Sequence, residues 1–337
     1  MKKLFVLFSV IFLVTGSQAQ GYDIKINLKG CKDSIIFLVK YQWDQQYVVD
    51  TCKNFKNGAI TFKGNKPLDK GMYILVSQAS VVYFEFFVND SQKMSITGDV
   101  ADPTGNLAVT GSKENELFFS YLKFVANKNK DFGKVIEQSK GKSKEDSLKY
   151  VQDKVKDFMA EAKKFDTDFM EKAKGTFVYD FMNLKTEKEP PSIPLAKNNR
   201  PDSIYSYYYY KGHYFDGVNF QDERLIHLPL FDDRVKAYFE RVILNHPDTV
   251  IAEIDKILAK CIEGSLIYNH MLGYFTYKYE QSKIIGFDKV FVHLGDNYII
   301  TGKAKGVYTE ETVGKIKERL DKWRALRAEA RKSARPK

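Results

Sequence analysis

The hydrophobic pattern of this 337-residue chain changes at Gly111-Ser112-Lys113-Glu114-Asn115-Glu116-Leu117-Phe118. Before this segment apolar and polar residues alternate, which is typical of strands with one buried face. After it apolar residues recur every three or four positions, as they do along one face of a helix. Ser112 supplies an oxygen that suits the N-cap of that helix. The sequence therefore predicts an α+β fold, in which a small antiparallel β-sandwich domain (20–111) precedes an all-α helical domain (112–337).

The region before Gly111 consists of short apolar runs separated by Gly, Asn, Asp and Lys residues that favour turns. The runs are Tyr22–Leu28, Ile35–Val39, Tyr47–Val49, Ile60–Phe62, Tyr73–Val76 and Val82–Val88. Short strands at a spacing of roughly ten residues are typical of a β-sandwich.

The first nineteen residues have the organisation of a secretory signal peptide. Lys2 and Lys3 precede an apolar run, Leu4–Val14, and small residues, Ser17 and Ala19, follow at the positions that signal peptidase reads. A membrane anchor is the alternative, but a span needs about 20 apolar residues and this run is shorter. The sequence therefore predicts a signal peptide (1–19) cleaved after Ala19, and a periplasmic or otherwise exported protein with no transmembrane span after cleavage.

The formal net charge of +10 at pH 7 falls to +8 when Lys2 and Lys3 leave with the signal. A basic protein can bind nucleic acid or an anionic surface, or can simply be soluble. Here the lysines are scattered along predicted helices with glutamates between them, so we expect solvated helix faces and no nucleic-acid partner.

Three cysteines are present, and none forms a C-x-x-C motif, which excludes thiol-disulfide exchange by that route. Cys31 and Cys52 flank a predicted hairpin and are candidates for a disulfide, which would close a loop of about twenty residues and add about 3 kcal/mol in the chain-entropy model. Free thiols are the alternative. Cys261 falls on the apolar face of a predicted helix, as an inert buried thiol does.

The helical domain contains a long predicted helix (146–174) with an apolar stripe. Its apolar residues are Leu148, Val151, Val155, Phe158, Ala162, Phe165 and Phe169. Such a stripe can form the seam of a homodimeric coiled coil, or it can dock on its own domain, which is the commoner case. A Pro-rich break (189–194) follows, further helices begin near Pro201, Pro247, Ser265 and Thr309, and a basic tail ends the chain.

The densest group of chemically active side chains lies in the segment YSYYYYKGHYFD (205–216) and shortly after it. The residues that could share a ligand groove are Tyr207, Tyr210, His213, Asp216, Asp222, Arg224 and His293. Aromatic rings with polar tips suit such a groove. The alternative is a half-buried helix whose tyrosines bond outward.

His293 has an acid, Asp296, three residues on that could orient its imidazole. No second histidine stands at ligand spacing, whereas zinc sites need three or four ligands. No motif of a serine hydrolase, zinc protease or phosphate-binding loop occurs. We therefore expect no cofactor, metal or catalytic residue.

Three segments carry a resemblance to a known family. They are GHYFD (212–216), FQDERL (220–225) and GFDKVFVHL (286–294). On these motifs, residues 176–324 resemble DUF5106, a helical domain of unknown function from Bacteroidetes. Residues 21–111 look like the small β-domain DUF4369 that often precedes it.

In that family the two domains usually stand before a thioredoxin-like domain similar to the thiol-disulfide proteins of the TlpA and ResA type. This sequence departs from the pattern, because it reaches Lys337 without a C-x-x-C motif. We therefore assign the redox function of that family to no residue of this chain. The chain is interpreted either as part of a longer protein or as a version with the accessory part alone.

Two functions follow. The first is an exported, non-catalytic accessory or binding module of the cell envelope, whose partner is an envelope protein or a thioredoxin-like domain supplied by another chain. The second is a small-ligand-binding protein or enzyme with a site in the aromatic cluster around His213, which requires the candidate side chains to converge.

Overall fold

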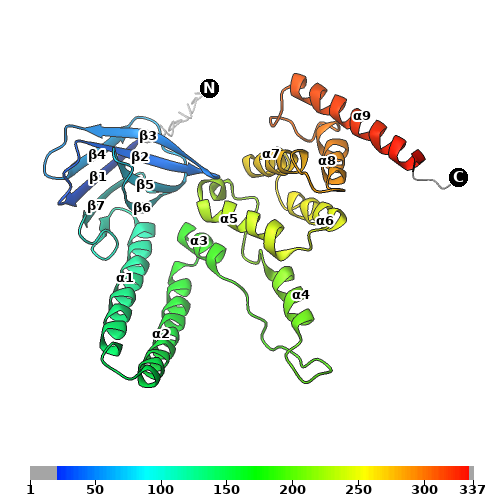
Figure 1. Cartoon of the computed structure of the whole chain (residues 1–337). Coiled ribbons are helices and arrows are strands. Elements are labelled where there is room, and N and C mark those ends of the chain that lie inside the picture. The colour runs from blue at the N-terminus through cyan, green and yellow to red at the C-terminus, as the bar shows by residue number, and fades with distance from the viewer. Residues whose placement is uncertain (1–20, 334–337) are drawn as a thin grey trace, which may run out of the picture.

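The computed structural model describes residues 21–333, in which strands precede helices (Figure 1). This order confirms the predicted α+β class: β8 ends at Thr110 and α1 begins at Lys113. Within the described part of the chain, no helix is long and apolar enough to cross a membrane. The predicted signal peptide (1–19) and the end of the basic tail lie outside the described residues.

The strands form two four-stranded sheets, with the orders β4-β1-β7-β8 and β3-β2-β5-β6. Their bounds are β1 (Tyr22–Lys29), β2 (Ile35–Gln42), β3 (Gln45–Lys53), β4 (Ala59–Gly64), β5 (Gly71–Ser77), β6 (Val82–Val88), β7 (Lys93–Asp99) and β8 (Ala108–Thr110). The alternating residues Ile24, Ile26 and Leu28 of β1 are all buried, as the sequence predicts. β5 is buried along nearly its whole length because the helical region covers its other face. A Cβ at Gly71 would overlap the Cβ of His227 there, so the close approach requires glycine.

Two strands were not predicted, and one pairing differs from a purely antiparallel sandwich. β7 contributes only Met94 and Ile96 to the core, between polar residues, and β8 has three residues. β7 pairs with β1 in parallel, with Ile26 opposite Ile96, while the other pairs are antiparallel. This parallel pair is possible because more than sixty residues separate the two strands, enough for a crossover through the second sheet.

The helical region begins with two long helices and continues with shorter ones. Their bounds are α1 (Lys113–Ser139), α2 (Lys144–Ala173), α3 (Phe177–Lys185), α4 (Ser203–His213), η1 (Glu223–His227), α5 (Pro229–Ala237), η2 (Tyr238–Val242), α6 (Pro247–Leu258), α7 (Leu266–Glu280), α8 (Asp288–Leu294), η3 (Gly295–Ile299) and α9 (Glu310–Ser333). Ser112 caps α1 as predicted, by accepting a hydrogen bond from the Asn115 amide. The predicted helix 146–174 corresponds to α2, and the Pro-rich break lies between α3 and α4.

α1 and α2 form a hairpin that projects from the rest of the molecule (Figure 1). At about 1.5 Å per residue, each helix is roughly 40 Å long. α2 buries only Phe169 and Ala173, which lie in its last turns. Away from the body the two helices therefore pack mainly on each other.

The turn between β2 and β3 ties the sandwich to the helical region. Trp43, at the tip of this β-hairpin, is 2% exposed and has a φ of 57°. Its amide donates a 2.7 Å hydrogen bond to the carbonyl of Ile226, and its ring contacts those of Phe231 and His270. The buried apolar residues of sandwich and helices thus form one continuous core.

Candidate functional site

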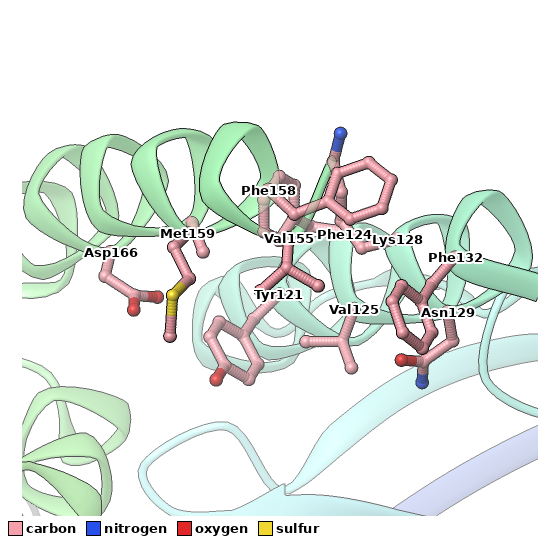
Figure 2. A pocket seen from close by; sticks show the side chains of 11 residues that line it. Tyr121, Phe124, Val125, Lys128, Asn129, Phe132, Val155, Phe158, Met159 and Asp166 are labelled. Atoms are coloured by element: carbon pink, nitrogen blue, oxygen red, sulfur yellow. The ribbon is translucent and has the colours of Figure 1, made fainter. Parts of the chain in front are cut away.

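An apolar groove of about 420 Å³ runs between α1 and α2 on the projecting hairpin (Figure 2). Its lining residues are Tyr121, Phe124, Val125, Lys128, Asn129 and Phe132 of α1, with Val155, Phe158, Met159, Ala162 and Asp166 of α2. On both helices they recur at spacings of three and four, which places them along one stripe of each helix. The groove is therefore made by two apolar stripes that face the same opening.

Aromatic contacts hold the two helices of this groove together. The rings of Phe124 and Phe165 stack at 3.7 Å, and those of Phe132 and Phe158 meet edge to face at 6.2 Å. In contrast, Met159 is 69% exposed and points out of the hairpin (Figure 2). The rings fix the two helices side by side, and Met159 adds an exposed apolar side chain to the groove.

Two charged residues flank the apolar part of the groove. The Lys128 ammonium pairs with Glu161 and lies over the rings of Phe124 and Phe158, at 5.7 and 5.5 Å from their centroids. Asp166 has no ion pair within 4 Å among the described residues, and burial raises the pKa of its carboxyl, an effect that the Lys185 ammonium partly offsets. An unpaired carboxylate beside apolar side chains favours a cationic group on whatever binds there.

Asn115 fixes the base of the hairpin to the sandwich. Its buried side chain accepts from the Phe87 amide and donates to the Phe87 carbonyl, both at 2.7 Å, so it pairs with β6 as a neighbouring strand would. The ring of Phe87 packs against Phe118 of α1 and Phe177 of α3. α1 therefore leaves the sandwich in one fixed direction.

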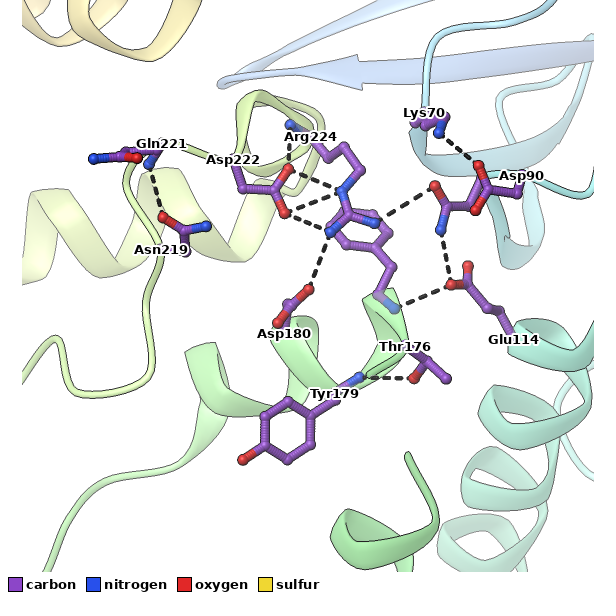
Figure 3. A network of polar contacts seen from close by, with 12 residues as sticks. Lys70, Asp90, Glu114, Thr176, Tyr179, Asp180, Asn219, Gln221, Asp222 and Arg224 are labelled. Atoms are coloured by element: carbon purple, nitrogen blue, oxygen red, sulfur yellow. Dashed lines mark hydrogen bonds and ion pairs between the residues drawn. The ribbon is translucent and has the colours of Figure 1, made fainter. Parts of the chain in front are cut away.

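A polar network centred on Arg224 completes this base (Figure 3). The guanidinium binds both carboxylate oxygens of Asp222 and lies 3.2 Å from Asp180, with the ring of Phe177 4.3 Å away. It also donates to Asn89, which follows β6, at 3.5 Å. Arg224 thus connects the sandwich, α3 and η1.

Glu114 adds α1 to the same network. It accepts from Asn89 at 2.8 Å and from the Phe177 amide at 3.0 Å. Asp180 has its pKa raised by burial, an effect that Arg224 partly offsets. Because Arg224 and these acids are engaged with one another, Asp222 and Arg224 do not belong to a ligand groove with α4.

The other predicted groove residues lie apart from this network. On α4, Tyr210 donates to Glu187 at 2.9 Å and Tyr207 packs against Tyr208. His213 lies 2.6 Å from Asp216 at the surface. Of the predicted groove residues in this region, Asp216 lines a pocket together with Tyr208, Lys211 and Gly212 of α4, whereas Tyr207, Tyr210 and His213 do not line it.

His293 is also in a separate place, and its carboxylate partner differs from the expected one. Its Nε2 lies 2.9 Å from Asp255 of α6, which also accepts from Tyr298 at 2.6 Å. Asp296, the acid three residues on, pairs with Arg324 instead. The structure therefore divides the predicted set among α4, the Arg224 network and the α6–α8 contact, and the convergence that a catalytic site needs is not seen.

The cysteines are free thiols in the structure. The Cys31 thiol faces Asp33 and Tyr83 of β6, whereas Cys52 lies on β3 at the opposite edge of the same sheet, so the candidate disulfide is not present. Cys261 follows α6, and burial raises the pKa of its thiol to about 12. Among the residues that the structure describes, no group of three or more His, Cys, Asp or Glu side chains could hold a metal ion.

Comparison with known proteins finds two family models along the chain. A domain of unknown function, DUF4369, matches residues 22–118, and a second domain of unknown function, DUF5106, matches residues 138–322. No curated protein and no solved structure matches the chain. The first match covers the sandwich and the start of α1, and the second begins at the end of α1 and reaches α9.

Proposed function

The chain belongs to the DUF5106 family and carries an N-terminal DUF4369 domain; from this premise we propose that it is a non-catalytic binding module of the cell envelope that holds a partner protein in the groove between α1 and α2. The observation that carries the proposal is the exposed apolar groove on a projecting, firmly anchored hairpin. Exposed apolar surfaces of this kind are typical of protein interaction sites.

The partner's contact is an amphipathic helix. A groove between two helices with apolar residues at spacings of three and four accepts a third helix with the same spacing. From Tyr121 to Phe132 the groove extends over roughly 16 Å, about three turns of helix. A lysine or arginine at one end of that helix would pair with Asp166. A thioredoxin-like domain, implied by the family resemblance, is the first candidate to carry such a helix.

A comparative pull-down tests this function. The mature chain, Met159→Asp and Ala160→Asp are each tagged and incubated with envelope extract. Both substitutions place an acid at an exposed position of α2, but only Met159 lines the groove. We expect the wild type and Ala160→Asp to retain the same envelope protein, and Met159→Asp to retain at least tenfold less.

If the wild type and both variants recover the same proteins, or if none of them recovers any protein, the groove is not the binding site. Identification of the retained protein by mass spectrometry then tests the thioredoxin-like candidate. Export is tested separately by fusing residues 1–30 to alkaline phosphatase, which is active only outside the cytoplasm. Activity of this fusion, lost when Leu4–Val14 is interrupted by arginines, is the expected result.

A further inference from the structure

A second concave site, independent of the groove, lies between α4 and α6. This pocket of about 520 Å³ brings together Lys211 of α4, Lys256 of α6 and Lys260 just after it. Two acids, Glu253 and Asp216, also line it. Three lysines therefore line one cavity, and the partners of their ammonium groups decide whether a ligand could use them.

Glu253 forms the floor and is fully engaged. It is 5% exposed, and one of its carboxylate oxygens accepts from both Lys211 and Lys256, each at 2.9 Å, while the other accepts from Tyr238 at 2.9 Å. Because both ammonium nitrogens lie at this distance from the same oxygen, they converge to within two hydrogen-bond lengths of each other. Each keeps N–H donors that Glu253 does not use.

The Lys211 side chain is only partly exposed at the pocket. It is 19% exposed, and one shared carboxylate is its only ionic partner among the described residues. A partly buried ammonium group with spare donors gains from an additional anionic partner. The convergence of Lys211 and Lys256 therefore prepares a position for a ligand oxygen.

The remaining charges in the pocket leave it positive. Lys260 lies over the ring of Phe220 and has no carboxylate partner among the described residues. Asp216 is engaged by His213. The two acids of the pocket are thus outnumbered by three lysines, and both already have partners.

Part of the pocket wall is aromatic or apolar. Tyr208 is exposed at the rim, Phe215 and Ile257 are apolar, and nothing lies within 4 Å of a Cβ built at Gly212. From these contacts we infer that the α4–α6 pocket binds a small organic anion, with its phosphate or carboxylate between Lys211, Lys256 and Lys260 and a ring or other apolar part against Tyr208.

The inference is tested by calorimetric titration with phenyl phosphate, inorganic phosphate and phenol. Phenyl phosphate should bind with a dissociation constant in the millimolar range or below, and at least tenfold more tightly than inorganic phosphate or phenol. The double variant Lys256→Ala/Lys260→Ala should weaken it at least tenfold. Lys283→Ala, which removes an exposed lysine outside the pocket, should leave binding unchanged.

Absence of phenyl phosphate binding at millimolar concentration would overturn the inference, as would equal binding by the double variant. Equal binding of inorganic phosphate would overturn the assignment of an organic ligand. Titration with benzoate compares a carboxylate with the phosphate of phenyl phosphate. The compound that binds more tightly shows which anionic group the lysines prefer. Circular dichroism of the double variant confirms that its helices are intact, since Lys256 and Lys260 are exposed.

Discussion

Two hairpins of this molecule place large apolar side chains at opposite extremes of exposure. The β2–β3 hairpin buries Trp43 at its tip against α5 and α7, whereas the α1–α2 hairpin leaves Met159 exposed on its side. In the first the chain supplies its own partner residues. In the second, no residue among those that the structure describes covers Met159, which is why we propose that the first hairpin serves stability and the second serves binding.

The ionisable groups near Trp43 and those in the groove also differ in their pKa shifts. Near Trp43, burial lowers the pKa of His270 to about 4 and also lowers that of His227. Among the groove residues, Asp166 alone has a shifted pKa, which partial burial raises and the Lys185 ammonium partly offsets. We therefore expect the Trp43 contact to respond to acid through its histidines, whereas the groove contains no histidine.

The largest effect is expected from Trp43→Ala. Removing a buried tryptophan costs about 3–5 kcal/mol of unfolding free energy, and here it also removes the link between sandwich and helices. Val48→Ala, at a 59% exposed position of the same hairpin, should cost less than about 0.5 kcal/mol. Urea unfolding of both variants measures the difference, and equal losses would mean that the Trp43 contact does not hold the two regions together.

A smaller loss is expected from Arg224→Ala at the base of the projecting hairpin. The substitution leaves Asp180, Asp222 and Glu114 without their common cation. Breaking a buried pair costs about 3–5 kcal/mol, and because Arg224 is partly exposed we expect about 2 kcal/mol. Arg224→Lys keeps the charge but not the two-pronged bond to Asp222, so its loss should be intermediate in urea unfolding. An unchanged stability in Arg224→Ala would show that the hairpin is fixed without Arg224, by the Asn115, Glu114 and Phe87 contacts.

Acid should weaken the Trp43 contact before it affects the groove. The pKa of His270 is about 4 when folded and near 6.5 when unfolded, so between these values the unfolded chain binds the extra proton. Its contribution is complete above pH 6.5 and is lost as the pH falls toward 4. Thermal unfolding should therefore occur at a lower temperature at pH 5 than at pH 7, by a few degrees.

His270→Gln should reduce this dependence, whereas His213→Gln, at a surface position, should leave it as in the wild type. A pH dependence that is the same in both variants and the wild type would show that His270 is not its source and would assign it to other groups, such as His227 or the carboxylates.

The apolar periodicity of the sequence predicted most strands and helices. It did not predict the contacts between residues far apart in the chain. Trp43 stands in the polar segment QWDQQ (42–46), and the residues that bury it follow about 180 to 230 positions later. Only the folded chain brings Ile226 and Phe231 to it. β7 was missed for a local reason, because two apolar residues between polar ones are too weak a signal for a strand.

The candidate sites show the same limit. The apolar stripe of α2 was recognised in the sequence, which left open whether it docks on its own domain or forms a homodimer seam. In the structure the stripe packs on α1, and a groove remains between the two helices. The aromatic cluster on α4 was recognised as well, but helix geometry turns Tyr208 and Lys211, and not Tyr207 and Tyr210, toward the pocket. Which side of a helix faces a cavity depends on the neighbouring helix, here α6. The local sequence pattern does not determine where that neighbour lies.

The smallest effect is expected where the comparison is sharpest, on α2 itself. Met159→Ala and Leu148→Ala remove exposed side chains and should each change the unfolding free energy by less than about 0.5 kcal/mol. Phe169→Ala, at a buried position of the same helix, should cost about 3–5 kcal/mol. A loss above about 1 kcal/mol in Met159→Ala would show that the groove is covered in solution. If the unfolding midpoint of the wild type then also rises with protein concentration, the cover is a second copy of this chain, because only association makes stability depend on concentration.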